Sequence, residues 1–255
     1  MYEEAAPPPR LAGVARCVWR SASAGPKRIV PDGCLDLVVG DGAVFIAGPD
    51  TAAWSSVTRP GAELHGLRFA PGRAAAVLGV AADELRDTRV PLGDLWGREG
   101  ELLAERLLTG EMTPAEAVAS RLPSAAAPDP AVAELVTRLE AGAARVAEAV
   151  TPPSTRAPVK DPAEPATISE RRLRRRFVQA VGYGPATYLR VSRFQRAIAL
   201  APGAPNLAAL AVAAGYSDQA HLSRDCRALT GLTPRAYFRP ASTVDTTARD
   251  RLHSA

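Results

Sequence analysis

Residues 169–188 read SERRLRRRFVQAVGYGPATY, and residues 218–237, 49 positions later, read DQAHLSRDCRALTGLTPRAY. Both stretches contain the pattern L-x-R-x6-G-x-x-P-x-x-Y at identical spacing, so five residue types recur in register. Composition alone would rarely produce this match, because the chain is rich only in Ala, Arg and Pro. The repeat therefore predicts two copies of one structural unit.

Each copy is expected to be a helix that ends in a glycine turn. Ser169 and Asp218 open the two copies, and both residue types favour the N-cap of a helix. Gly182 and Gly231 fit the position after a helix where the backbone turns left-handed. The proline that follows each glycine by three residues stops the first helix and suits the start of the next one.

A complete helix-turn-helix is predicted at the second copy. The run NLAALAVAA (206–214) predicts a helix, and the short turn Gly215–Ser217 separates it from the helix that follows Asp218. A helix, a short turn containing glycine and a second helix form the signature of this DNA-binding motif.

The side chains outside the apolar faces of these two helices suit DNA. Burying several unpaired guanidinium groups would be costly, so the arginines of the first helix are expected on the surface. In the major groove Gln can pair with adenine and Arg with guanine, and either side chain can reach phosphate. The expected outward set is Arg171, Arg172, Arg174, Arg175, Gln219, His221, Arg224 and Arg227.

Positive charge is concentrated in the same region. Residues 169–239 hold twelve arginines, no lysine and three acidic residues, whereas the rest of the chain holds 19 basic and 24 acidic residues. A basic segment joined to a mildly acidic one is the electrostatic pattern expected of a nucleic-acid binder with a separate second domain. The alternative is an Arg-rich helix without a polyanionic partner.

The segment from Asn206 to Arg239 closely resembles the second half of the DNA-binding domain of the AraC/XylS family of transcription regulators. Ser169–Arg196 resembles the first recognition helix of that domain and the long helix that connects its two units. The resemblance implies one recognition helix from each unit in successive major grooves on one face of the DNA. It implies that the residues nearest the bases are Arg171, Arg172, Arg175, Gln219, Ala220, His221 and Arg224, and the full expected DNA-binding set adds Ser169, Arg174, Ser217, Asp218 and Arg227.

The chain departs from the family pattern ahead of the first recognition helix. Residues 151–167 contain five prolines and few large apolar residues, which predicts an extended linker or an insertion. The best candidate for the missing helix, residues 144–150, lies on the far side of this stretch. Either that helix docks across a looped-out insertion, which we expect, or the first unit is incomplete and residues 171–176 hold phosphate.

The N-terminal half is predicted to be a β domain followed by helices. Short apolar runs alternate with Gly, Pro and Asp, and Asp41-Gly42 is a dipeptide that tight hairpins prefer. Several short strands at this spacing suggest an antiparallel barrel or sandwich. Strands are expected at 11–20, 27–30, 35–39, 44–47 and 63–69, and helical segments at 71–79, 82–87, 95–108, from Thr113, and from Asp129 to about Val150.

Three motifs in this half, IVPDGCLDLV (29–38), GLRFAPG (66–72) and VPLGDLW (90–96), resemble the sensor domain of a subgroup of the same regulators with no assigned ligand. The implied fold is a small cupin-like β-barrel with trailing helices, which in the wider family binds an effector or dimerises. The expected fold class is thus α+β with an all-α C-terminal domain. The expected divisions are an effector-binding or dimerisation domain (1–125), a helix of the first helix-turn-helix (126–150), a linker or insertion (151–167), the DNA-binding domain (168–240) and a tail (241–255).

Charged residues embedded in apolar β segments mark a candidate effector site. Asp32 and Asp36 flank the turn and strand after residue 31, and Arg68 lies on a later predicted strand. The alternatives are turn chemistry for Asp32 and a structural ion pair for the other two residues.

Catalysis, metals and cofactors are not expected. The three histidines are scattered and form no His-x-His pair of the kind a metal-binding cupin would need. The three cysteines are widely separated, so they predict neither a disulfide framework nor a Cys-x-x-Cys site. Two alternatives stay open: a general nucleic-acid-binding protein, and a regulator in which Cys17 or Cys34 accepts a methyl group.

The sequence also bears on location and partners. No run approaches the roughly 18 apolar residues of a membrane helix, and Met1–Glu4 does not begin a signal peptide. A soluble cytoplasmic protein is therefore expected. Its expected partners are double-stranded operator DNA, RNA polymerase, a small-molecule effector and a second copy of the chain, with no membrane.

Overall fold

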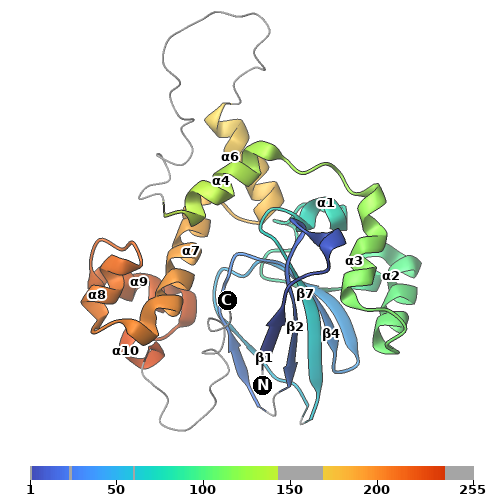
Figure 1. Cartoon of the computed structure of the whole chain (residues 1–255), viewed down its shortest axis with the longest axis horizontal. Helices are drawn as coiled ribbons and strands as arrows, with labels where there is room; N and C mark the ends of the chain where they lie inside the picture. The colour runs from blue at the N-terminus through green and yellow to red at the C-terminus, as the bar shows by residue number, and fades with distance from the viewer. Residues whose placement is uncertain (1, 23–24, 60, 143–168, 239–255) are drawn as a thin grey trace, which may run out of the picture.

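The computed structural model of the chain describes residues 2–22, 25–59, 61–142 and 169–238. An N-terminal domain built on a β-sheet is followed by a C-terminal region made of helices, and the two regions lie side by side (Figure 1). This is the α+β division that the sequence predicts.

Six strands form one antiparallel sheet in the order β1-β2-β7-β4-β5-β8. The hairpin between β4 and β5 turns at Asp41 and Gly42 with φ values of 54° and 77°, as the dipeptide predicts. Within the described residues no ladder joins the edge strands β1 and β8, so the sheet is open there. The strands are β1 (Tyr2–Ala5), β2 (Ala15–Ala22), β4 (Asp36–Gly40), β5 (Ala43–Ala47), β7 (Glu63–Phe69) and β8 (Arg89–Pro91).

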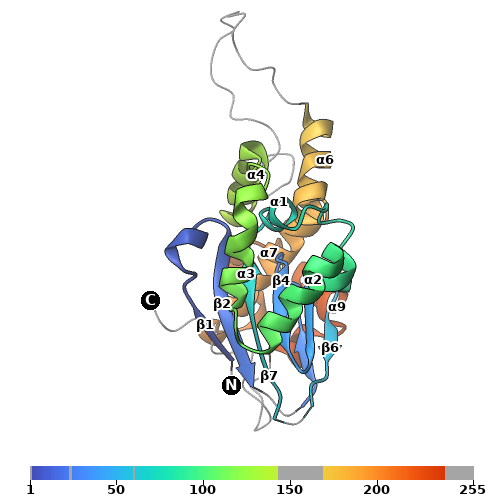
Figure 2. The same ribbon diagram turned by 90° about the vertical axis from the view of Figure 1, so that its right-hand side faces the viewer.

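A second sheet and three helices cover the two faces of this sheet. The strands β3 (Lys27–Ile29) and β6 (Trp54–Ser56) pair with each other and line a cavity together with residues of the main sheet. The other face packs against α1 (Ala74–Leu78), α2 (Leu92–Leu108) and α3 (Pro114–Arg121), of which α2 and α3 stand in front of the sheet in Figure 2.

Side chains along each strand alternate between the core under the helices and the cavity on the other face of the sheet. On β4, Leu37 and Val39 join the apolar core beneath the helices, whereas Asp36 and Val38 line the cavity. On β7, Leu67 belongs to the same core. A strand places successive side chains on opposite faces, so the sequence pattern assigns every second residue to the cavity.

Several expected elements differ from the structure in detail. The strand predicted at 11–20 is a 3-10 turn, η1 (Pro9–Leu11), followed by β2, because the chain bends at Gly13 with a φ of 72°. The segment 82–87, predicted to be helical, forms turns. Thr113 caps α3 through the expected capping box with Glu116.

The C-terminal region repeats its helices at the interval found in the sequence. Helix α6 begins and ends 49 residues before α9, and α7 begins 49 residues before α10. The prediction of two copies of one unit is thus confirmed. The helices are α6 (Glu170–Val181), α7 (Pro185–Leu200), α8 (Leu207–Ala213), α9 (Gln219–Thr230) and α10 (Pro234–Tyr237), with η3 (Ala201–Gly203) between α7 and α8.

Helix α4 (Pro130–Glu140) packs against this helical region. Asp129 caps it as expected, and Leu135 and Leu139 enter the same buried core as Phe177 of α6 and Phe194 of α7. The helix ends at Glu140, earlier than the predicted Val150, and a short turn, η2 (Leu122–Ser124), precedes it. The predicted helix at 144–150 and the Pro-rich stretch lie outside the described residues.

Candidate nucleic-acid interface

The two repeated helices α6 and α9 each bury one face and expose the other. Leu222 of α9 is fully buried and Leu173 of α6 packs against the same core. On the outer faces Arg175 and Arg224, which occupy equivalent positions of the repeat, are both exposed. Neither arginine has an ion pair or hydrogen bond within the described part of the chain. Both guanidinium groups are therefore available to an external anion or base.

The remaining arginines of α6 divide into two groups. Arg174 pairs with Glu170 (Nη2 to Oε1, 2.6 Å), and Arg176 pairs with Asp129 at the start of α4 (Nε to Oδ2, 2.5 Å). Arg171 and Arg172 are exposed and make no such pair among the residues that the structure describes. Arg176 thus helps to hold α4 in place, and the outward charge of α6 comes mainly from its other arginines.

His221 occupies the flank of α9. Its ring nitrogen Nδ1 lies 3.0 Å from Ser217 Oγ, and Nε2 lies 3.8 Å from an oxygen of Asp225. The ring also packs edge-on against Tyr216, with the centroids 5.0 Å apart. These contacts hold the imidazole against its own motif, so the groups that extend outward at this helix are Gln219, Ala220, Arg224 and Arg227.

The two expected N-caps behave differently. The carboxylate of Asp218 accepts a hydrogen bond from the backbone N–H of His221 at 2.6 Å and so begins α9. Ser169 holds the extended N-cap conformation ahead of α6, but its side chain makes no capping hydrogen bond. Both residues, like Ser217, are exposed at the helix starts where a DNA backbone would approach.

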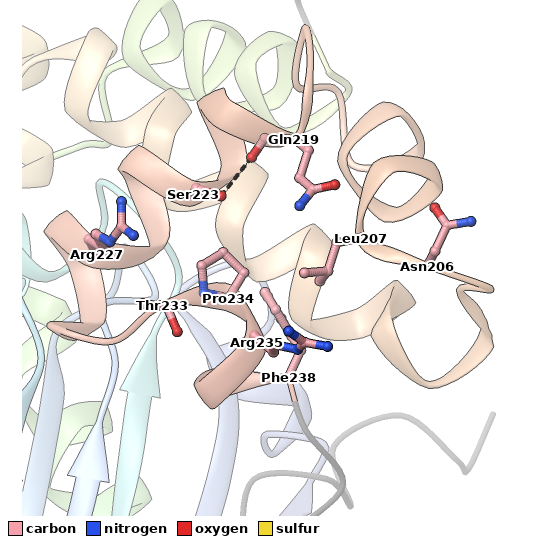
Figure 3. Close-up of a pocket in the computed structure, with 9 residues that line it drawn as sticks. All are labelled: Asn206, Leu207, Gln219, Ser223, Arg227, Thr233, Pro234, Arg235 and Phe238. Atoms are coloured by element: carbon pink, nitrogen blue, oxygen red, sulfur yellow. Dashed lines mark hydrogen bonds between the residues drawn. The ribbon is translucent and has the colours of Figure 1, made fainter.

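An open groove of about 630 Å³ runs along one side of α9 (Figure 3). Gln219, Ser223 and Arg227, spaced four residues apart, form one wall, and Arg235 at the start of α10 faces them. Two cationic side chains beside a recognition helix suit the phosphates that flank a major groove. Sequence reasoning missed Arg235, although its place directly after Pro234 at a helix start was a usable signal. The rest of the lining is Asn206, Leu207, Thr233, Pro234 and Phe238.

The C-terminal ends of both repeated helices, α6 and α9, are held by the N-terminal domain. At α6, the backbone N–H of Ala82 donates to Gln179 O at 2.7 Å. At α9, the N–H of Ala53 donates to Leu229 O at 2.7 Å. The last carbonyls of a helix have no partner within it, so these donors satisfy groups that would otherwise need water.

One arginine reinforces each of these contacts. Arg86 donates to Gly182 O at 3.2 Å, and Arg28 donates to Thr230 O at 2.5 Å. A cation also interacts favourably with the negative end of the helix dipole. The N-terminal domain therefore contacts the C-terminal end of each repeated helix through one backbone N–H and one arginine, a relationship that the sequence did not suggest.

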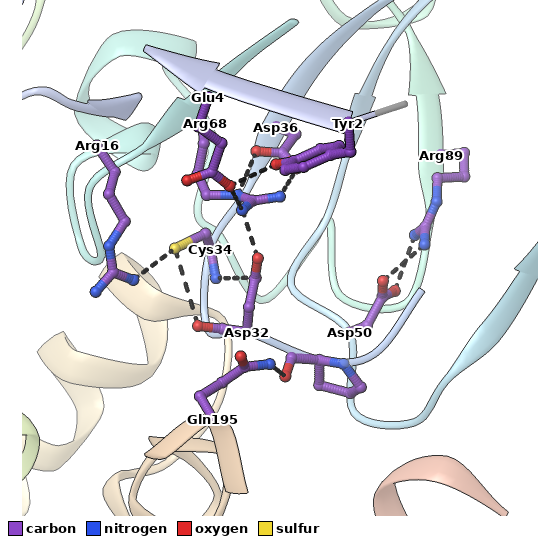
Figure 4. A network of polar contacts seen from close by, with 11 residues as sticks. Tyr2, Glu4, Arg16, Asp32, Cys34, Asp36, Asp50, Arg68, Arg89 and Gln195 are labelled. Carbon is purple, nitrogen blue, oxygen red and sulfur yellow. Dashed lines mark hydrogen bonds and ion pairs between the residues drawn. The ribbon is translucent and has the colours of Figure 1, made fainter. Parts of the chain in front are cut away.

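The three residues of the predicted effector site meet in the cavity between the two sheets (Figure 4). Arg68, which is 8% exposed, makes two hydrogen bonds of 3.0 Å to Asp36 and lies 3.2 Å from Asp32. Burial alone would lower the pKa of Arg68, but Asp32 and Asp36 raise it well above its ordinary value. A third carboxylate, that of Glu4, lies 3.3 Å from the same guanidinium, so one cation is shared among three acidic side chains.

A second ion pair on the cavity wall was not predicted. Arg89 pairs with Asp50 (Nη2 to Oδ2, 2.7 Å), and its guanidinium lies 4.1 Å from the centre of the Trp54 ring. Burial raises the pKa of Asp50, although Arg89 opposes that shift. Asp50 and Arg89 lie 39 residues apart, so no local pattern connects them.

The cysteines do not resemble reactive thiols. Burial raises the pKa of Cys17 to about 12 and raises that of Cys34 as well. Both thiols therefore stay protonated near neutral pH, which removes the support for a methyl-acceptor role.

Among the residues that the structure describes, no group of His, Cys, Asp and Glu could hold a metal ion. Within those residues, too, no helix has the length and apolar character to cross a bilayer.

Two family models match separate parts of the chain. Residues 163–240 match the family described as Helix-turn-helix domain, and residues 3–91 match the Domain of unknown function (DUF6597). No curated protein matches the chain in sequence.

Two solved structures were found with low similarity scores. A crystal structure of ToxT from Vibrio cholerae O395 has a TM-score of 0.41 and 9% identity, covering 87% of this chain and 95% of that one. A 1.65 Å structure of ToxT from Vibrio cholerae has a TM-score of 0.40 and 10% identity, covering 93% and 97%.

The domain matches agree with the motifs and with the repeated helices. The chain is therefore a DNA-binding transcription regulator with a helix-turn-helix domain of the AraC type at its C-terminus and a DUF6597 domain at its N-terminus.

Proposed function

We propose that this regulator reads an operator by placing α6 and α9 in successive major grooves of one duplex, and that the N-terminal domain modulates this binding when a small molecule occupies its cavity. The observation that carries the first part is the equivalence of Arg175 and Arg224. Each is exposed and unpaired within the described residues, at the same position of a 49-residue repeat. Two copies of one unit with the same outward cation suit two turns of a duplex groove.

The residues assigned to DNA differ in role. Arg171, Arg172, Arg175, Gln219, Ala220 and Arg224 are proposed to face the bases. The others are proposed to hold the backbone. Ser169, Ser217 and Asp218 lie at helix starts, Arg227 lines the groove beside α9, and Arg174 lies on α6 where it pairs with Glu170. His221 contacts Ser217 and so orients the start of α9. Contacts to phosphate set the register of a protein on DNA, and contacts to base edges set its sequence preference.

Support for modulation comes from the contacts between the two domains. The N-terminal domain binds the last turns of α6 and α9, so a change in that domain would alter how the two helices are held. Asp32, Asp36 and Arg68 form the polar floor of its cavity. RNA polymerase and a second copy of the chain remain predicted partners.

The test is selection of bound duplexes from a random pool, followed by competition. Wild-type protein should prefer its selected duplex over random duplex by on the order of 10³-fold or more. Arg175→Ala and Arg224→Ala should each cost about 1–3 kcal/mol with that duplex and relax preference at different half-sites. Arg98→Ala, which removes an exposed arginine of α2, is the matched control and should bind as the wild type does.

A general nucleic-acid-binding protein is the second candidate, favoured by the run of exposed arginines on α6. Equal competition by selected and random duplexes would favour it and would contradict operator reading.

A further inference from the structure

The cavity between the two sheets has an unusual combination of walls. Its volume is about 100 Å³, and aromatic side chains line it together with ion-paired charges. The main sheet contributes Trp19 and Phe45, and the β3–β6 ribbon contributes Trp54. An apolar cavity of about 150 Å³ holds a benzene molecule, so the smaller volume here limits an occupant to a single small ring at most.

The polar groups of the wall that lack partners are hydrogen-bond donors. The indole Nε1 of Trp19, the indole Nε1 of Trp54 and the Nε of Arg89 are buried and have no hydrogen-bond partner in the described structure. The carboxylates of Asp32 and Asp50, by contrast, accept hydrogen bonds or ion pairs from Cys34, Arg68 and Arg89. A buried polar group without a partner is costly, so an occupant that supplies acceptors would relieve this cost.

The charge of the wall argues for an uncharged occupant. Three cationic residues and three acidic residues line the cavity, and Arg68 and Arg89 are each paired with a carboxylate. An ion brought into this balanced, partly buried space would have no free counter-charge and would lose its hydration.

The same wall holds the DNA-binding helices on its outer side. On β3, Lys27 and Ile29 line the cavity, whereas Arg28 between them points the other way and donates to Thr230 O of α9. Next to β6, Ala53 donates its N–H to Leu229 O, and Trp54, the following residue, lines the cavity. A single layer of strand backbone, the β3–β6 ribbon, therefore separates the cavity from α9.

Two loops repeat this arrangement. Gly48 and Asp50 line the cavity, while Pro49 between them lies against Gly182 at the end of α6. Asp32 also lines the cavity, and its neighbour Pro31 accepts a hydrogen bond of 2.6 Å from Gln195 of α7. Each segment thus contacts the cavity on one side and the helix-turn-helix domain on the other.

We propose that the cavity binds a small, uncharged, flat molecule with at least one hydrogen-bond acceptor, and that the β3–β6 ribbon transmits its presence to α9. The inference deepens the proposed function and rests on it for the second step. A ribbon of two three-residue strands has little stability of its own, so its position depends on what packs against both of its faces. Filling the cavity would shift Arg28 and Ala53 together, and with them the end of the second recognition helix.

The binding step is tested with three single-ring probes of similar size. Pyrazine is uncharged and has two acceptors, benzene has none, and N-methylpyridinium carries a charge. Ligand-observed NMR and quenching of tryptophan fluorescence on the full chain should show binding in the order pyrazine, benzene, N-methylpyridinium, with affinities on the order of millimolar. The double variant Trp19→Phe/Trp54→Phe keeps aromatic walls but lacks both indole donors, so in it pyrazine should lose its advantage over benzene.

The binding step is overturned if pyrazine binds no better than benzene to the wild type, or if the double variant keeps the difference while circular dichroism shows it folded. These measurements use no DNA, so they decide the ligand class even if operator reading fails.

The transmission step is tested with the selected duplex. Saturating pyrazine should change the affinity of the wild type for that duplex by fivefold or more, the lower range of coupling between sites. Arg28→Ala removes the link to Thr230 but leaves the cavity wall, so it should bind pyrazine normally and show a clearly smaller change. Unchanged duplex affinity in the wild type despite pyrazine binding would overturn transmission, and absence of any preferred duplex would instead count against the proposed function.

Discussion

Pro49 of the N-terminal domain covers Gly182, the residue that ends the first recognition helix. A Cβ added to Gly182 would lie 2.3 Å from Pro49 Cγ, a distance that real Cβ atoms do not adopt. Its counterpart in the repeat, Gly231, has the same left-handed backbone (φ of 73° against 99°), yet the nearest atom to its added Cβ would be Arg28 Nη1 at 3.8 Å. Hydrogen bonds from the N-terminal domain hold both helix ends, and at the first helix the close packing of Pro49 on Gly182 adds to them.

Alanine at these two glycines should separate backbone strain from docking. Each substitution should cost about 1 kcal/mol because a residue with a Cβ disfavours the left-handed conformation. Gly182→Ala should cost a further 1–3 kcal/mol, roughly, because it forces Pro49 away. Urea unfolding of both variants measures the difference, and equal losses would show that the Pro49 contact adjusts freely.

The two N-caps offer a second matched comparison. Asp218→Ala removes a carboxylate that caps α9 and should destabilise the protein by about 1 kcal/mol. Ser169→Ala removes a hydroxyl that makes no capping bond, so its free energy of unfolding should stay within a few tenths of the wild-type value. Thermal and urea unfolding check both, and a large effect of Ser169→Ala would mean that the hydroxyl caps α6 in solution.

Residues that face bases and residues that face phosphate should differ in salt dependence. Gln219→Ala should weaken binding to the selected duplex by roughly 1–3 kcal/mol and relax base preference at one position. Arg235→Ala should weaken selected and random duplexes alike and reduce the slope of log affinity against log salt by about one. Titrations at several salt concentrations distinguish the two. If Arg235→Ala altered base preference without changing the slope, its assignment to phosphate would be wrong.

Asp225 of α9 should make stability depend on pH. Burial raises its pKa, despite the nearby cationic groups of His221, Arg190 and Arg193. A carboxyl with a raised folded-state pKa stabilises the fold below its ordinary pKa, and this contribution is lost as the pH rises through the raised value. Asp225→Asn should therefore gain stability relative to the wild type as the pH rises above about 4, the ordinary pKa of an Asp carboxyl.

Asp41 provides a control, because its pKa is shifted in the opposite direction to that of Asp225. Hydrogen bonds from Arg59 lower its pKa, so its contribution is present above the ordinary pKa and lost as the pH falls through the lowered value. Asp41→Asn should accordingly be less stable than the wild type near neutral pH and approach it in acid. Urea unfolding across this range checks both variants, and parallel curves for the two would contradict the assigned causes.

Much of the helical region could be predicted because its determinants are local. The repeat, the caps and the glycine turns lie within a few residues of the features they set, so α6 and α9 were placed within a residue. The hairpin at Asp41 and the strand at 63–69 followed from the same kind of local pattern. The meeting of Asp36 with Arg68 was anticipated only as two charges in apolar strands, and pairing in register on neighbouring strands brought them together.

The contacts between distant segments could not be predicted. Arg28 lies 202 residues from Thr230, and nothing in the sequence around either residue marks the other. The segment 82–87 was misassigned because its residues suit a helix locally, whereas its backbone forms turns in which Leu85 N–H donates to Ala82 O and Thr88 N–H donates to Leu85 O. The position of Trp19 and Trp54 around the cavity could not be predicted either, since the strand pairing that places them there is not visible in one sequence.

The contacts of the N-terminal domain with the ends of α6 and α9 also have a consequence for the spacing of half-sites in the operator. Two DNA-binding helices that move independently can bind half-sites at several separations along the DNA. Helices that are both held by one domain, as α6 and α9 are, would accept one separation and one relative orientation of the half-sites. If α6 and α9 read two half-sites as proposed, the N-terminal domain would set the distance between those half-sites. Mutations along its docked edge would broaden or shift the permitted spacing while leaving the preferred bases of each half-site the same.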